Sequence, residues 1–368
     1  MWAGFLAYLG VLWKAPRLGR RVVWGLILVL VAGFALAPVL LSHDVYSYVD
    51  YARLGVRHGL DPYVHPPLAA PGDPAYLHVT WTEATSAYGP LFTLLTYPLA
   101  WLPVGAAVAA LKAIAALSIL GIAALTARIA AWRGIDPVRA AAFVALNPLV
   151  LVHVVGGAHN DALTMLFAML AVAALLSSRE AAGGAALVAA IATKLSAAVI
   201  APFALVATAT SPPTGRKRAY IDRNRPVGRL LLGGVGAAAA IGVAAYLAFG
   251  WEWLHGFGLA GENQSRTSHL SIPITLARLI GLDPDGVRLA AAILFCALVA
   301  YLLIWTARGN DWIRAAAWAT FALLVATAWL LPWYLVWPLP LVAISRDRPL
   351  QLLTLALTAY QLGARIPL

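Results

Sequence analysis

Charged residues are scarce in this chain. Asp, Glu, Lys and Arg together make up 11% of its 368 residues, whereas hydrophobic residues make up 62%. A soluble globular domain carries roughly 25% charged residues. So little charge cannot cover a surface that faces water, and the composition therefore excludes an ordinary soluble protein. It indicates an all-α membrane protein that crosses the bilayer many times, with room for about ten helices of ~20 residues each.

Cysteine and the motifs of soluble enzymes are also rare or missing. The single cysteine, Cys296, lies in an apolar run, which excludes a disulfide framework and a thiolate metal site. The sequence has no P-loop, no dinucleotide-binding glycine fingerprint, no nucleophile elbow and no metalloprotease helix. The candidates for chemistry are therefore polar residues within or between the apolar runs.

The net charge of +11 is divided between two sets of loops. One set holds 18 of the 26 Lys and Arg residues and five acids, a balance of +13. The other set holds 8 bases, 10 acids and all eight histidines, a balance of −2. Because an excess of Lys and Arg marks the cytoplasmic side, we expect a multi-pass plasma-membrane protein with a cytoplasmic N-terminus. This pattern needs no nucleic-acid partner.

The apolar runs predict one membrane domain over residues 1–368, and its parts can be bounded from the sequence. Residues 1–12 are expected on the inner interface. The first span is expected at 22–41 and is uncleaved, although the residues around it resemble a secretion signal. The remaining parts are a first outer loop, central spans, a second outer loop and C-terminal spans, expected at 42–103, 104–250, 251–286 and 287–368.

The first outer loop is expected to contain interfacial helices. Val45, Val49, Ala52 and Val56 recur at helical spacing, with polar residues on the neighbouring face, and Gly59 occupies a C-cap position. On that helix, Arg53 and Arg57 are expected to pair with Asp50 one turn away. The stretch 91–102 is short and contains a proline, which favours a second interfacial helix over a crossing.

The apolar run 182–209 is expected to leave and re-enter the membrane on the same side. Both of its flanks are basic, and its ~28 residues are too few for two full spans. We therefore predict a broken, re-entrant pair of helices with Lys194 near the break. Broken backbone persists in a membrane only where protein or water surrounds it, as around a substrate cavity.

Two polar clusters follow apolar runs on the predicted outer side. Asp44 comes directly after the first span and could be a helix N-cap, but Ser42 could fill that role and leave the carboxylate for chemistry. His159, Asn160 and Asp161 follow two glycines at the end of another span. These consecutive polar residues exceed what a cap needs, and ionisable groups at membrane depth usually serve function.

Cationic and aromatic residues complete the candidate set. Lys194 lies in an apolar run without any acid, whereas Lys112 lies near a span end and is interpreted as structural. Asn263, Arg266 and His269 are three residues apart and could share a helical face, although Glu262 could pair with Arg266. Trp333 and Tyr334 end a span on the outer side, where an interfacial aromatic belt is the alternative.

In order along the chain, these residues resemble the GT-C superfamily of integral-membrane glycosyltransferases, in particular the actinobacterial polyprenyl-phosphate-mannose-dependent α-(1→6)-mannosyltransferases. The resemblance rests on the following segments: Asp44 with Tyr46 and Tyr48, Gly59-Leu60-Asp61-Pro62-Tyr63, Tyr88-Gly89-Pro90, Asn147-Pro148, Gly157 to Leu163, Thr193-Lys194-Leu195, and Pro332-Trp333-Tyr334 before Trp337. The chain is shorter than expected for the mycobacterial backbone enzymes.

The resemblance implies a GT-C-like bundle of about ten to eleven transmembrane helices, with the active site on the outer face. It implies an inverting transfer of a sugar, most simply mannose, from a polyprenyl-phosphate donor to a glycan or glycolipid acceptor. Asp44 corresponds to the family's catalytic base. No cofactor is implied, and we expect activity without a metal, although Asp161 is the residue that could supply a ligand.

Roles follow for the other candidates. Lys194, Arg266 and His269 are proposed to bind the donor phosphate. A second set is proposed to contact the donor or acceptor sugar: Tyr46, Tyr88, His159, Asn160, Asp161, Asn263, Trp333 and Tyr334. Two alternatives stay open, namely a GT-C enzyme that uses another hexose or a pentofuranose, and a transporter or flippase for a lipid-linked solute. No inverted repeat of transporter type is visible in the sequence.

Overall fold

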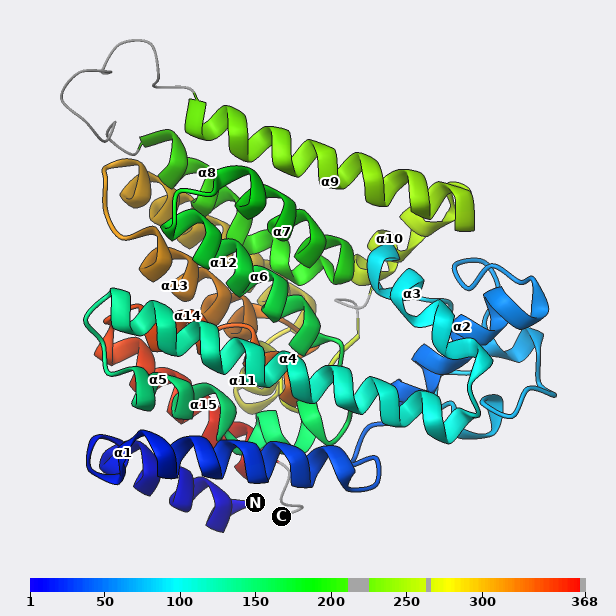
Figure 1. Cartoon of the computed structure of the whole chain (residues 1–368), viewed down its shortest axis with the longest axis horizontal. Coiled ribbons are helices and arrows are strands. Elements are labelled where there is room, and N and C mark those ends of the chain that lie inside the picture. The colour runs from blue at the N-terminus through cyan, green and yellow to red at the C-terminus, as the bar shows by residue number, and fades with distance from the viewer. Residues whose placement is uncertain (211–224, 263–265, 365–368) are drawn as a thin grey trace.

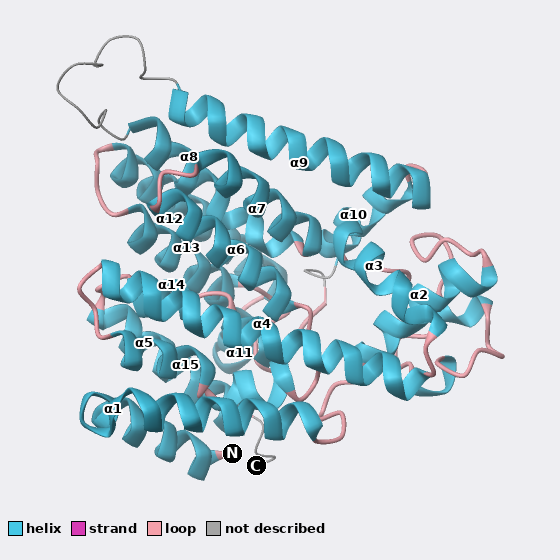
Figure 2. Cartoon of the chain, viewed as in Figure 1, coloured by secondary structure: helices cyan, strands magenta, loops and turns pink. Residues whose placement is uncertain are grey.

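The structure, a computed structural model, describes residues 1–210, 225–262 and 266–364. The described residues are all-helical, with 78% helix and no strand (Figure 2). Asn263 lies outside the described residues, as do Arg216, Lys217, Arg218 and Arg223 of the predicted basic loop. The all-α prediction is confirmed for the part of the chain that can be described.

Four described helices are long and apolar enough to cross a membrane. They are α1 (Trp2–Leu36), α4 (Val104–Trp132), α9 (Arg225–Phe249) and α12 (Pro284–Ala307). Shorter apolar segments run beside them: α6 (Asp161–Leu176), α7 (Glu180–Thr193), η5 (Leu195–Ile200) with α8 (Ala201–Thr210), α13 (Trp312–Ala326), and η8 (Pro332–Val336) with α14 (Leu339–Ile344). The predicted count of ten to eleven crossings stays a prediction.

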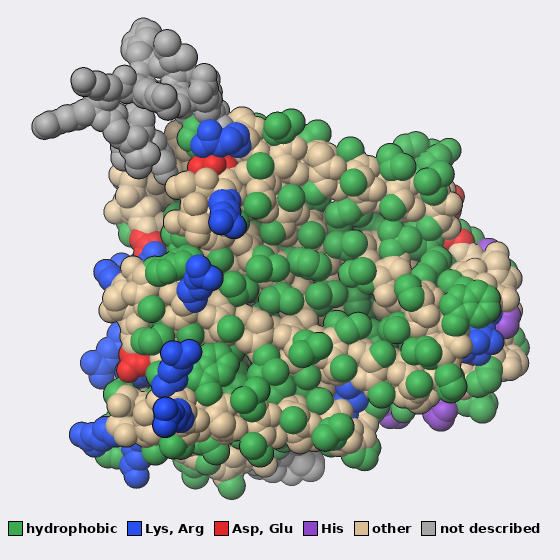
Figure 3. All heavy atoms as spheres, viewed as in Figure 1, with side chains coloured by type: hydrophobic (Ala, Val, Ile, Leu, Met, Phe, Trp, Pro, Cys, Tyr) green, Lys and Arg blue, Asp and Glu red, His purple; other side chains and the backbone are tan. Residues whose placement is uncertain are grey.

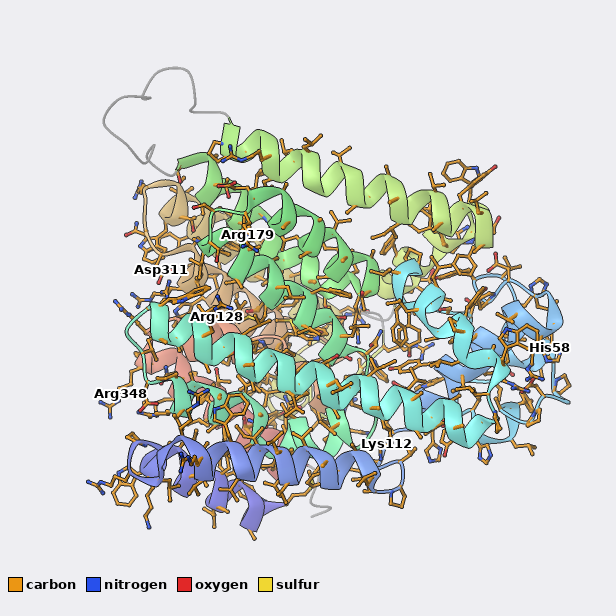
Figure 4. The ribbon with its side chains drawn as sticks, in the orientation of Figure 1. His58, Lys112, Arg128, Arg179, Asp311 and Arg348 are labelled. Carbon is orange, nitrogen blue, oxygen red and sulfur yellow. The ribbon has the colours of Figure 1, made fainter. Side chains whose placement is uncertain are left out.

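The helices run between two ends of the molecule (Figure 1), and these ends differ in charge (Figure 3). Arg128, Arg179 and Arg348 lie at one end, and His58 lies at the opposite end (Figure 4). On the face shown in Figure 3, blue Lys and Arg side chains gather at the first end, purple His side chains at the other, and hydrophobic side chains cover the stretch between them. We call these the basic end and the opposite end.

Helix α1 differs from the predicted interfacial segment followed by a span. Its backbone leaves the helical region at Gly19, where φ is +77°, and the chain changes direction there (Figure 1). Phe5, Tyr8 and Leu12 are buried in the main core, and the Tyr8 hydroxyl donates to the Phe143 carbonyl at 2.7 Å. The N-terminal segment is therefore helical and packed against α5 (Pro137–Ala145) rather than held only by an interface.

The first loop is held together by the helix that the sequence predicts there. That helix, α2 (Asp44–His58), ends at Gly59 in the left-handed conformation, as expected for a C-cap. The expected pairing of Asp50 is wrong. Arg53 binds Asp73 at 2.7 Å, because the loop returns an acid to that face of the helix, and Arg57 donates to the Ala100 carbonyl.

The second interfacial helix is present in two short pieces, α3 (Pro90–Thr96) and η3 (Tyr97–Trp101). Gly89, at the start of α3, donates its N–H to the Thr193 carbonyl at 3.2 Å, and a Cβ there would lie 2.1 Å from the Ala192 oxygen. Only glycine fits this close approach. It holds the first loop against the C-terminal end of α7, directly beside Lys194.

Two predicted apolar runs are broken. The run 140–155 is divided at Asn147-Pro148 into α5 and a π-helix, η4 (Val150–Val155). The run 182–209 is divided at Lys194, which has extended backbone angles (φ −158°, ψ 128°) between α7 and η5. The break therefore occurs where the sequence places it, and the re-entrant path of this pair stays a prediction. The remaining described α-helices are α10 (His255–Glu262), α11 (Ile272–Ile280) and α15 (Arg348–Gly363).

Candidate active site

A cavity of about 1270 Å³ lies where the first loop meets the helix breaks. One part of its wall is polar and comes from α2, the segment 80–88 and Lys194. The other part is apolar and comes from η5, α8, α12 and α13; it includes Ala198, Val199, Pro202, Phe295, Val299, Leu303 and Leu323. The cavity therefore joins a polar compartment to an apolar one that lies among apolar helices.

Asp44 is the first residue of α2 and lines the polar part. The N-cap of α2 is His43 and not Ser42, although the Ser42 hydroxyl accepts a hydrogen bond from the Asp44 backbone N–H at 3.3 Å. The Asp44 carboxylate does not cap the helix and is left for other contacts. Trp81 donates its indole N–H to Asp44 Oδ1 at 3.3 Å, and His159 Nδ1 lies 3.8 Å from Oδ2.

The Asp44 carboxyl has a raised pKa. Burial raises it, and this effect exceeds the opposing effects of the Lys194 charge and of the hydrogen bonds with Trp81 and Ser42. A carboxylate with a raised pKa is a stronger base than an ordinary aspartate and titrates closer to neutral pH. Asp44 can therefore accept a proton from a hydroxyl group placed in the cavity.

Lys194 has a partner that is distant in sequence. Its ammonium group binds both oxygens of Asp161 at 2.8 and 2.9 Å, and Trp337 donates its indole N–H to Asp161 Oδ1 at 2.6 Å. Asp161 is fully buried and does not line the cavity, whereas Lys194 does. The expectation that Lys194 lacks a partner was limited to its own apolar run, and the fold brings the acid from the start of α6.

Aromatic rings form the wall next to this ion pair. Lys194 Nζ lies 5.0 Å from the centre of the Tyr334 ring and 5.7 Å from that of Trp337, and these two rings are stacked 4.2 Å apart. Trp333 also lines the cavity, and its ring stacks on His159 at 3.8 Å. Tyr334 and Trp333 are therefore part of a packed wall, which a belt of residues facing lipid would not require.

Arg266 reaches the cavity from the second loop. Its guanidinium lies 5.1 Å from the centre of the Trp81 ring, and both residues line the cavity. Arg266 and His269 lie outside any helix, beyond the end of α10, so the expected shared helical face is wrong for these two residues. His269 is exposed and does not line the cavity.

The other predicted sugar contacts divide into three groups. Tyr88 lines the cavity beside Tyr48, with ring centres 4.8 Å apart. His159 and Asn160 are buried directly behind the wall, and their side chains make no hydrogen bond with any described residue. Tyr46 does not line the cavity and stacks instead on His78.

The sequence reasoning missed two tryptophans. Trp81 contacts both Asp44 and Arg266, and Trp337 contacts Asp161. A signal existed for Trp81, because it is a large aromatic residue in the polar run Thr80-Trp81-Thr82-Glu83. Among the described residues, no group of three or more His, Cys, Asp or Glu side chains could hold a metal ion.

Comparison with known proteins points to one group. Residues 1–210 match the family model described as "Alpha-(1->6)-mannopyranosyltransferase, N-terminal domain". The chain is 30% identical over 387 aligned positions to α-(1→6)-mannopyranosyltransferase A of Mycobacterium tuberculosis, which covers 93% of this chain and 70% of that protein.

Two shorter matches agree with it. A Corynebacterium glutamicum protein with the same name is 30% identical over 50% of this chain and 37% of its own length. Another M. tuberculosis α-(1→6)-mannopyranosyltransferase is 34% identical over 35% of this chain and 23% of its own length. No solved structure matches the chain.

Proposed function

Because the chain belongs to the α-(1→6)-mannopyranosyltransferase family, we propose that it transfers mannose from a polyprenyl-phosphate donor to a hydroxyl of a glycan or glycolipid acceptor. Its homologues are named mannosyltransferases, and the helices of the chain are those of a membrane protein. The identity of the donor, the identity of the acceptor and the side of the membrane on which transfer occurs are the parts of this function that we propose.

The observation that carries the proposal is the two-part cavity. A polyprenyl-phosphate sugar has a long apolar chain, an anionic phosphate and a polar sugar. The apolar wall between α8, α12 and α13 suits the chain, Lys194 supplies positive charge for the phosphate, and Asp44 lies in the polar part. A nucleotide-sugar donor would have no use for the apolar wall.

The proposed chemistry is a single displacement. The acceptor hydroxyl attacks the anomeric carbon, its proton passes to Asp44, and the bond from that carbon to the phosphate oxygen breaks, so that polyprenyl phosphate leaves and the configuration inverts. One base is sufficient, as in inverting glycoside chemistry. Phosphate leaves without a general acid, and cationic side chains stabilise its charge. Lys194 is the first candidate for that role because the helix break holds it at the cavity wall.

The charge of the two ends supports an orientation. The basic end is proposed to face the cytoplasm, as the excess of Lys and Arg predicts. The part of the cavity that the first loop lines then faces the outer side. On that side a lipid-linked donor is the natural source of an activated sugar. The relatives of this chain are named mannosyltransferases, which argues against the transporter alternative. The remaining alternative is a transferase that uses a different sugar.

The test is transfer of mannose from polyprenyl-phosphate mannose to short α-mannosides by the purified protein in detergent, followed by mass spectrometry. We expect Asp44→Asn to lose roughly 10²–10⁴-fold in kcat, because a general base contributes about that factor. Glu252→Gln is the matched control, since this half-buried acid pairs with His255 at 2.9 Å and does not line the cavity. Wild-type turnover in Asp44→Asn would refute the assignment of the base.

A further inference from the structure

The segment 80–85 forms a continuous part of the cavity wall next to Asp44. Its backbone is held by two hydrogen bonds, because Tyr51 donates its hydroxyl to the Ala84 carbonyl at 2.7 Å and the Leu68 N–H donates to the Thr82 carbonyl at 2.9 Å. These contacts use main-chain groups and leave the side chains free. The segment is therefore a rigid support whose side chains are available to a ligand.

Those side chains are polar and have no partners among the described residues. Thr80, Thr82, Glu83 and Thr85 all line the cavity, and no hydrogen bond or ion pair joins their side chains to any described residue. Hydroxyl groups both donate and accept hydrogen bonds, and a carboxylate accepts several. This combination matches the alternating donors and acceptors of a sugar and does not match a phosphate, which a carboxylate repels.

Ser47 supplies an independent observation. It lies one helical turn after Asp44 on α2 and lines the same cavity. Ser47 is 1% exposed, and its hydroxyl oxygen has no hydrogen-bond partner among the described residues. An unsatisfied buried polar group is costly and calls for an explanation. A ligand hydroxyl next to Asp44 would satisfy it.

The position of these residues distinguishes acceptor from donor. The donor's lipid is assigned to the apolar wall and its phosphate to the Lys194 region, so its sugar lies between Lys194 and Asp44. An inverting attack brings the acceptor to the face of the anomeric carbon opposite the phosphate. The acceptor hydroxyl must also reach Asp44, and the segment 80–85 is the part of the wall that contacts the Asp44 carboxylate, through Trp81.

We propose that Ser47 and the segment 80–85 form the acceptor subsite, which binds a neutral sugar rich in hydroxyl groups and presents one of them to Asp44. This proposal rests on the function proposed above. Trp81 has two roles in it. Its ring, 39% exposed at the cavity wall, packs against the acceptor, and its indole N–H holds the Asp44 carboxylate.

The first test compares Michaelis constants for donor and acceptor, with short α-mannosides as acceptor. Ser47→Ala should raise the acceptor KM roughly three- to ten-fold, the value of one lost neutral hydrogen bond, and Glu83→Gln should raise it further because a charged acceptor is lost. In both variants the donor KM should move less than the acceptor KM. Thermal stability of Ser47→Ala should not fall, because the hydroxyl has no partner in the part of the chain that the structure describes.

Matched controls are available away from the cavity. Ser177→Ala removes a hydroxyl that donates to the Ala173 carbonyl, and Glu252→Gln neutralises a half-buried acid that pairs with His255. Both should keep the wild-type Michaelis constants. The acceptor subsite would be wrong if Ser47→Ala and Glu83→Gln left the acceptor KM unchanged, or if they raised the donor KM more.

Two substitutions of Trp81 separate its two proposed roles. Trp81→Phe keeps a ring but removes the N–H that lowers the pKa of Asp44, so the acid limb of the kcat profile should move to higher pH. Trp81→Ala should show this movement and also raise the acceptor KM. An unchanged acid limb in Trp81→Phe would refute the positioning role.

The failure of this inference can be told from failure of the proposed function. Binding of short α-mannosides to the wild-type protein is measured by NMR without any donor. Binding that Ser47→Ala weakens, without transfer from polyprenyl-phosphate mannose, would support the subsite and overturn the proposed donor. Transfer by the wild type with an acceptor KM insensitive to the variants would keep the function and overturn the subsite.

Discussion

The ion pair between Lys194 and Asp161 should be measurable as a coupling energy. Asp161 is fully buried, whereas the Lys194 side chain is 18% exposed and can reach water in the cavity. Removing one partner of a buried ion pair costs about 3–5 kcal/mol because the other charge is left uncompensated. The two single variants should therefore differ in cost.

Lys194→Met should be the more destabilising variant. Among the described residues it leaves a fully buried carboxylate with the Trp337 indole N–H as its one remaining partner, which predicts a loss near the upper part of about 3–5 kcal/mol. Asp161→Asn leaves a lysine that can turn toward the cavity, and the amide oxygen can still accept from Trp337. Its cost should be about 1–3 kcal/mol, the value of an imperfectly satisfied buried group.

The double variant Lys194→Met/Asp161→Asn restores neutrality. It should be less destabilised than the sum of the single variants by up to about 3 kcal/mol, the upper range for coupling of contacting residues. The assay is reversible unfolding in mixed micelles, followed by tryptophan fluorescence. Additivity within about 0.5 kcal/mol would refute the ion pair, because that is the behaviour of independent sites.

The chain offers a matched control lysine. Lys112 is also buried, but its ammonium donates to the carbonyls of Ala37 and Pro38 at the end of α1 and is not paired with an acid. Lys112→Met combined with Asp161→Asn should be additive. This result would show that the coupling belongs to the ion pair and not to the general loss of a buried lysine.

Three further predictions concern pH, metal and orientation. Burial and the neighbouring Asp73 charge raise the pKa of Asp50 to about 7. Between pH about 4 and 7 only the folded state holds this proton, so the free energy of unfolding should fall as pH rises through that range. Asp50→Asn should flatten this slope when unfolding is measured as a function of pH. Transfer should survive a chelator, since Lys194 and Trp337 already bind Asp161; a strict requirement for Mg²⁺ or Mn²⁺ in the product assay would contradict this. In a cysteine-free background, an impermeant thiol reagent applied to the outer face should label Gly72→Cys and not Asn310→Cys, and the reverse would invert the orientation.

The sequence was sufficient for elements that depend on local pattern. The α2 helix and its glycine C-cap follow from helical spacing and from the left-handed conformation that glycine adopts readily. The break at Lys194 follows from a run too short for two spans. The structural interpretation of Lys112 agrees with its contacts at the end of α1. Each of these features was read from the pattern of one helix or one apolar run, without knowledge of the segments that pack against it.

Contacts between distant segments could not be predicted in the same way. Arg53 forms its ion pair with Asp73 and not with Asp50 on its own helix. Asp161 lies 33 residues before Lys194, the lysine that it binds. Trp81 was passed over because the residues that it contacts, Asp44 and Arg266, lie on other segments. A single sequence gives the types of charge available and not their partners, so pairing by spacing succeeds only when the partner is on the same helix.

The broken backbone locates the cavity better than any single side chain does. Lys194 lies between α7 and η5, Pro332 begins η8 after the end of α13, and the π-helix η4 precedes His159. Broken or irregular backbone at membrane depth persists only where protein or water satisfies its polar groups, and π-helices occur frequently at functional sites. Because these breaks lie beside the residues next to Asp44, a search for interrupted apolar runs should find the end of such a chain that holds the cavity even where no side-chain motif is recognised.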